Sequence, residues 1–265
     1  MVKLGGFLKV FISFVAIFLF TISCGNRVNN NSRDGVAETV HNYRGIFGES
    51  YLATGIFQSQ EAGDSIEDKH WLFTNLTRPF VMYGDYSSGF PAGNWNFGFK
   101  DSSLISSTWS IYKNELTNCS FSLPFPAKET VVDSFFFKLT ADNDSLGKIS
   151  IIVGITNVKL VGEALANFGP TSERGLLEQG YTFTKIPREI QNKQAKYYFT
   201  EYFLKDSTNR AMKLYHIYGY GPSNRLVEFS LAHDGPKEDW VKSIYNVMVA
   251  SLYVNGCRFY NPYLN

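Results

Sequence analysis

Residues 134–156 read SFFFKLTADNDSLGKISIIVGIT, and this stretch decides the fold class. Two runs rich in β-branched and aromatic residues, 134–140 and 149–156, flank a short linker of Asp, Asn, Ser and Gly. Runs of this composition favour strands, and a linker of turn-forming residues favours a hairpin between them. We therefore expect an antiparallel sheet that includes this hairpin.

Toward the C-terminus, the pattern predicts helix, then strands, then a last helix. Apolar residues recur at helical spacing from Leu160 to Phe168, and the Gly169-Pro170 pair predicts the end of that helix. A second short helix is predicted around Leu176, ending near Gly180. Strand-like runs follow, separated by turn-forming residues, at 181–186, 195–204, 211–218 and 225–231.

The last helix is predicted at about residues 236–253, with Pro236 at its first turn. Trp240, Ile244 and Met248 recur on one face of it, so we expect this stripe to pack on the sheet of residues 121–231. On the other face, long charged side chains are expected to stay in water, namely Lys237, Glu238 and Lys242.

On the N-terminal side, residues 39–110 are aromatic and rich in glycine and serine, without a long helical period. They predict a β-rich extension of the α+β domain at 111–256, in which helices flank an antiparallel sheet. Residues 257–265 follow as a C-terminal tail.

The first 24 residues predict export and a lipid anchor. Lys3 and Lys9 precede an uncharged run of eleven residues, Val10–Phe20, which is too short to span a bilayer and is typical of a signal peptide. Ser23-Cys24 follows directly and resembles the lipobox of bacterial lipoproteins, in the relaxed form that spirochaetes use, since Thr21 stands where leucine is usual. The resemblance implies cleavage after residue 23 and acylation of Cys24, with a mature charge of −1 in place of +1. The alternatives are an ordinary signal peptide and an uncleaved anchor.

Residues 24–38 predict a flexible tether between lipid and domain. They are polar and rich in asparagine, so they offer too little apolar surface to offset the entropy of ordering them. Two or more lipid chains would hold the protein on a membrane without any amphipathic surface.

Cys119 and Cys257 are the remaining cysteines. An exported protein meets an oxidising compartment, so these two could form a disulfide; the alternative is a pair of buried thiols. No cysteine pattern has the spacing of a zinc site.

Composition excludes several classes of protein. At 44% hydrophobic and 16% aromatic residues the chain can fill a core, and 25 basic against 24 acidic residues disfavour a nucleic-acid partner. No nucleotide-binding, metalloprotease or serine-hydrolase signature occurs, so we expect no cofactor, no metal and no catalytic residues.

Aromatic residues beside glycine and asparagine raise the alternative of a binding surface. The candidates are Tyr83, Tyr86, Trp95 and Phe97. Exposed rings of this kind grip sugars or peptides, whereas alternating aromatics in a strand more often form a core.

The order of predicted elements over about residues 110–255 resembles the PsbP-like superfamily, which includes the DcrB lipoproteins. FSLPFP at 121–126 resembles its early strand, which ends on proline; 134–140 and 149–156 resemble the next two strands, and Arg225 to Trp240 the passage into its last helix. The resemblance implies a docking or assembly function.

These observations favour a non-catalytic, lipid-anchored protein of the bacterial envelope. It would contact the membrane through its lipid and bind a protein partner, at the periplasmic face or the cell surface. The alternatives are a carrier of a small molecule or glycan, and a hydrolase.

Overall fold

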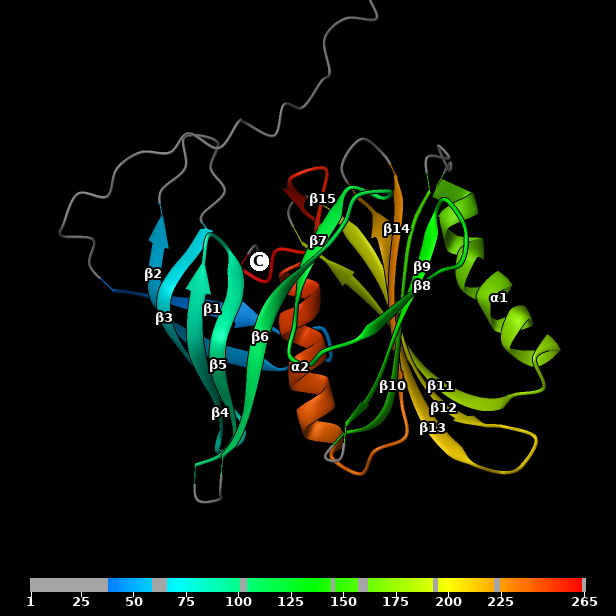
Figure 1. Ribbon diagram of the computed structural model, residues 1–265, viewed down its shortest axis with the longest axis horizontal. Helices are drawn as coiled ribbons and strands as arrows, with labels where there is room; N and C mark the ends of the chain where they lie inside the picture. The colour runs from blue at the N-terminus through cyan, green and yellow to red at the C-terminus, as the bar shows by residue number, and fades with distance from the viewer. Residues whose placement is uncertain are drawn as a thin grey trace, which may run out of the picture.

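The computed structural model describes residues 38–58, 66–100, 104–143, 146–156, 162–192, 195–221 and 225–263. Among these residues, the strands form two antiparallel sheets. Figure 1 shows four layers: the nine-stranded sheet, helix α2 (Glu238–Ala250), the seven-stranded sheet and helix α1 (Gly162–Glu178). The last helix thus lies between two sheets.

The nine-stranded sheet combines both ends of the described chain. Its strands, in spatial order, are β1 (Thr39–Arg44), β2 (Ser50–Gln58), β3 (Ile66–Asn75), β4 (Phe80–Ser87), β5 (Phe90–Phe99), β6 (Ile105–Asn114), β7 (Cys119–Leu123), β15 (Tyr253–Val254) and β16 (Cys257–Arg258). The first seven form a meander, and the C-terminal hairpin β15–β16 extends it beyond β7.

The seven-stranded sheet is built around the predicted hairpin. Its spatial order is β11 (Thr182–Gln191), β12 (Lys196–Lys205), β13 (Ala211–Tyr220), β14 (Leu226–His233), β10 (Gly147–Thr156), β9 (Phe136–Asn143) and β8 (Lys128–Val131). Alternation along these strands turns one face toward α2 and the other toward α1.

The antiparallel α+β architecture is confirmed, but its layering differs from the expectation. The predicted strand at 121–126 is β7, which pairs with β6 and β15 and so belongs to the other sheet. Both sheets contribute to one hydrophobic core, because α2 is shared between them. Phe47, in the β1–β2 loop, reaches across and packs its ring 4.9 Å from that of Tyr215 on β13.

Helix α2 is buried nearly all round rather than along one stripe. Trp240, Ile244 and Met248 are buried as predicted, and so are most residues between them. Lys242 is not free in water, because it contacts Glu201 on β12 of the seven-stranded sheet and the ring of Phe47 in the β1–β2 loop. Its ammonium lies 3.0 Å from Glu201 and 2.8 Å from Glu238.

Helix α1 runs through Gly169-Pro170, so the predicted stop is wrong. The hydroxyls of Thr171 and Ser172 donate to the carbonyls of Asn167 and Phe168, beside the turn where proline lacks an N–H. The helix ends at Glu178, close to the predicted end, and Gly180 follows with a φ of +82°. Within the described residues, neither helix is long and apolar enough to cross a membrane.

Candidate functional site

Three of the four predicted binding-surface aromatics lie in the core. Tyr86, Trp95 and Phe97 are at most 5% exposed, because alternation turns them to the face that packs on α2. Tyr83 lies on the opposite face, half-buried, with its ring 6.0 Å from that of His70. The four rings therefore do not form one binding surface, and that prediction is wrong.

The predicted Cys119–Cys257 disulfide is not formed, since Cys119 is a free, buried thiol. Val254 on β15 is paired with Cys119 on one side and with Cys257 on the other. Two strand spacings separate the two cysteines, roughly 9–10 Å between Cα atoms, whereas a disulfide needs less than about 7 Å. Burial raises the pKa of Cys119 to about 11, and the Thr117 hydroxyl lies 3.2 Å from its sulfur.

Cys24, the predicted lipidation site, lies outside the described residues, as do the predicted signal peptide and most of the tether. These predictions therefore stay predictions.

A pocket of about 620 Å³ lies at the end of the seven-stranded sheet, near the turn between β12 and β13. We call it the end pocket, and its lining residues come from β11, β12, β13, β14 and the segment after β14: Thr182, Phe183, Thr184, Phe203, Leu204, Lys205, Ala211, Met212, Lys213, His233, Asp234 and Gly235. Its volume is within the usual range for small-molecule sites.

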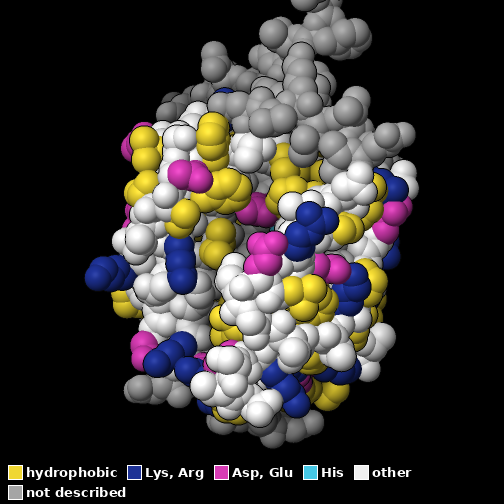
Figure 2. Space-filling model, turned by 90° about the vertical axis from the view of Figure 1, so that its right-hand side faces the viewer, with side chains coloured by type: hydrophobic (Ala, Val, Ile, Leu, Met, Phe, Trp, Pro, Cys, Tyr) yellow, Lys and Arg dark blue, Asp and Glu magenta, His cyan; other side chains and the backbone are white. Residues whose placement is uncertain are grey.

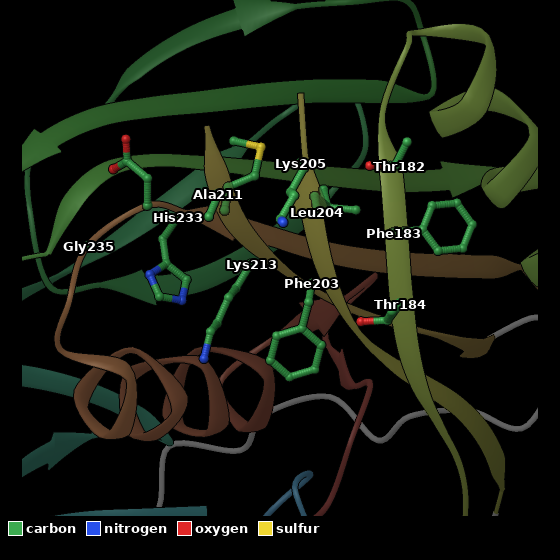
Figure 3. A pocket seen from close by; sticks show the side chains of 12 residues that line it. Thr182, Phe183, Thr184, Phe203, Leu204, Lys205, Ala211, Lys213, His233 and Gly235 are labelled. Carbon is green, nitrogen blue, oxygen red and sulfur yellow. The ribbon is translucent and has the colours of Figure 1, made fainter. Parts of the chain in front are cut away.

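Strand register builds the α2-facing part of the end pocket. Thr184 is paired with Phe203, Phe203 with Lys213, and Lys213 with His233, which gives a row across four strands. Figure 3 shows Phe203, Lys213 and His233 directed toward α2, while Phe183 points away from it. The β12–β13 turn fixes this register, because Asp206 accepts hydrogen bonds from the backbone N–H groups of Thr208 and Arg210.

His233 is the buried titratable group of the end pocket. Burial, together with the Lys213 charge, lowers its pKa to about 4, so the imidazole is neutral at pH 7. Its Nε2 lies 3.1 Å from the hydroxyl oxygen of Tyr215.

The charged groups around the end pocket are mostly paired. Lys213 bonds Glu238 at the start of α2, and Lys242 bonds the same carboxylate. Burial would raise the pKa of Glu238, but these two hydrogen bonds lower it to about 2. Asp234 pairs with Arg210 and also accepts from the backbone N–H of Lys148.

Sequence reasoning missed the end pocket because it has no local signature. The available signal was the predicted turn at 206–210, from which the register of Phe203 and Lys213 could be counted. The position of β14 beside β13 was also needed to add His233, and that pairing is a tertiary contact.

Within the described residues, no cluster of His, Cys, Asp or Glu could hold a metal ion.

Comparison with known proteins gives distant structural likenesses only. The chain matches no protein-family model and no curated protein. It is similar to the Ran-binding protein Mog1p of Saccharomyces cerevisiae, at 11% identity and a TM-score of 0.40, over 56% of this chain and 96% of that one. It is also similar to cyanobacterial PsbP from Synechocystis, at 15% identity and a TM-score of 0.37, over 59% and 98%. A third likeness is to a Pseudomonas aeruginosa protein of unknown function, at 11% identity and a TM-score of 0.31, over 51% of this chain and 93% of that one. These values are too low to carry an argument about function.

Proposed function

We propose that this chain is a lipid-anchored envelope protein that acts by binding, without catalysis, and that the end pocket is its binding site. The observation that carries the binding function is the end pocket itself. Its walls are largely apolar, with a few polar groups converging on one space, which is the usual make-up of a small-molecule site. This favours the carrier form of the proposal, with a small molecule rather than a glycan as ligand.

The lipid anchor is supported by the sequence alone, through Ser23-Cys24 and the polar residues that follow. Replacing Cys24 with Ala should move the protein from the detergent phase to the aqueous phase in a phase-separation assay, because the acylated thiol is lost. Cys119→Ala is the matched control and should stay in the detergent phase. Partition of Cys24→Ala with the detergent would contradict the anchor.

Native mass spectrometry tests the binding function. Protein purified from its native envelope should carry an added small mass. Ala211→Trp, which places a large ring in the end pocket, should remove that mass, while Leu177→Ser on the exposed face of α1 should retain it. A bound mass that survives Ala211→Trp would place the ligand elsewhere.

A protein partner is the second candidate, and one specific surface favours it. The β8–β9 turn exposes three large apolar side chains within five residues, Val131, Val132 and Phe135. The Asp133 carboxylate accepts from the N–H groups of Phe135 and Phe136 and orders the turn. Ordered, exposed apolar clusters are common at protein interfaces.

The hydrolase alternative has less support. His233 is a histidine with a shifted pKa in a pocket, as a general base would be. Its hydrogen-bond contact within the described residues is the Tyr215 hydroxyl, whose pKa burial raises well above its ordinary value. A raised pKa makes that hydroxyl a poorer nucleophile.

Membership of the PsbP-like superfamily likewise stays a proposal, supported by the order of elements from β9 to α2.

A further inference from the structure

The end pocket carries one positive charge that its walls do not neutralise. Lys213 is paired with Glu238, Asp234 is paired with Arg210, and His233 is neutral at pH 7. Lys205 makes no ion pair within the described residues, and it is exposed at the end of β12. The excess charge of the lining is therefore one positive charge, at Lys205.

Charges on the neighbouring helix do not offset this excess. α2 contributes Glu238, Asp239 and Lys242 near the pocket, and each is already in an ion pair: Glu238 with Lys213 and Lys242, Asp239 with Arg78, and Lys242 also with Glu201. These three charged side chains are therefore neutralised by protein groups and leave the charge of Lys205 uncompensated. The Asp206 carboxylate follows Lys205 directly, but it accepts hydrogen bonds within the β12–β13 turn from Thr208 and from the backbone N–H of Arg210. Lys205 therefore stays the available cation for a ligand.

The rest of the lining is suited to an apolar ligand body. Phe203 is half-buried beside Lys213, and the exposed Ala211, which is paired with Lys205, lies on the same face of the sheet. Exposed aromatic and aliphatic surface in a concave site gains free energy when a ligand covers it.

We propose that the end pocket binds a monoanionic amphiphile, with its anionic head on Lys205 and its apolar body against Phe203 and Ala211. This inference rests on the proposed function, in that it takes the end pocket as the binding site, and it adds the chemical class of the ligand. A single negative head matches the single excess charge. A free carboxylate and the head of a membrane lipid share this chemistry.

Calorimetry with three probes of equal chain length tests the proposal: octanoate, octanol and octylammonium, added to the full chain carrying Cys24→Ala. Octanoate should bind at least tenfold more tightly than octanol, and octylammonium most weakly. Lys205→Gln should abolish the preference for octanoate, and Lys205→Arg should keep it. Lys196→Gln, at the opposite end of the same strand, is the matched control and should change nothing.

The outcomes separate this inference from the proposed function. Equal binding of octanoate and octanol, or an unchanged preference in Lys205→Gln, would overturn the anionic ligand and leave the end pocket as an apolar binding site. Failure of all three probes to bind would overturn both proposals. Binding that survives Phe203→Ala unchanged would also overturn this placement of the ligand. Vesicles of phosphatidylglycerol, tested in parallel, show whether a lipid head competes with octanoate.

Discussion

Two glycines in the nine-stranded sheet each lie beneath an indole ring. A Cβ on Gly55 would lie 2.2 Å from the ring of Trp71, and a Cβ on Gly84 would lie 2.4 Å from the ring of Trp95. At both positions the register of the strand pair shifts. The missing side chain lets a large ring close the core where the sheet bends.

Gly84→Ala should therefore destabilise the protein by about 2–4 kcal/mol, because the buried ring of Trp95 cannot move without opening the core. Urea unfolding followed by fluorescence measures the change. Gly175→Ala is the control, since a Cβ there meets nothing within 4 Å and the residue is in α1. It should stabilise by about 0.5–1 kcal/mol through lower backbone entropy of the unfolded chain. Equal effects of the two substitutions would refute the packing argument.

His233 makes stability depend on pH. Its pKa falls from an ordinary 6.5 to about 4 on folding, so between these values the unfolded chain binds a proton that the native state does not. Stability from this group is complete above pH 6.5 and is lost as pH falls toward 4, by up to about 3 kcal/mol. His233→Gln should flatten the pH dependence of the free energy of unfolding between pH 7 and 4.5. The same slope in His233→Gln as in the wild type would contradict the prediction.

At the scale of elements, α2 depends on an ion pair that sequence reasoning placed in water. Glu201 on β12 is almost fully buried and lies 3.0 Å from the Lys242 ammonium. Lys242→Ala would leave that carboxylate buried without its partner, at a cost of about 3–5 kcal/mol. Lys237→Ala, at the exposed N-cap of the helix, should cost less than about 1 kcal/mol. Thermal unfolding of both variants, compared with the wild type, measures the two losses of stability. A loss in Lys242→Ala as small as that in Lys237→Ala would contradict the prediction.

The C-terminal hairpin is attached to β3 through a second buried ion pair. Arg258 on β16 bonds both carboxylate oxygens of Glu67 and the hydroxyl of Tyr253, and both charged side chains are buried. Glu67→Gln should destabilise by about 3–5 kcal/mol because it isolates a buried guanidinium. The double variant Glu67→Gln, Arg258→Met should recover part of that loss, since no unpaired charge is left. Urea denaturation of both variants tests this, and a double variant less stable than Glu67→Gln would count against it.

Local sequence patterns predicted most helices and strands, and they failed where contacts with a distant segment decide where an element ends or which residues are buried. The strands of the 134–156 hairpin, the turn at 206–210 and the glycine end of α1 all follow from neighbouring residues. Pro170 did not stop α1, because packing on Tyr198 and Tyr218 and the hydroxyl bonds of Thr171 and Ser172 sustain the helix. Lys242 and the aromatics Trp95 and Phe97 were misassigned because tertiary contacts decide their burial. Lys242 pairs with Glu201 on β12, whereas Trp95 and Phe97 lie in the core that both sheets share around α2, and no sequence period reports either contact.

For the whole molecule, the shared position of α2 has a thermodynamic consequence. Tyr245 packs its ring on Phe229 of the seven-stranded sheet, and the next residue, Asn246, accepts from the N–H of Ile46 in the β1–β2 loop, 2.8 Å away. Neither sheet can lose α2 without exposing its inner face. The two sheets should therefore unfold as one cooperative unit.

Hydrogen exchange with the Gly84→Ala variant tests this coupling. The substitution lies on β4, yet the amides of β13 in the other sheet should lose as much protection, in free energy, as those of β4. The reason is that both report the same global unfolding when they share one core. Loss of protection confined to β3, β4 and β5, with β13 unchanged, would show that the sheets open separately. The β11 amides serve as an internal control, because this exposed edge strand should exchange by local opening in both proteins.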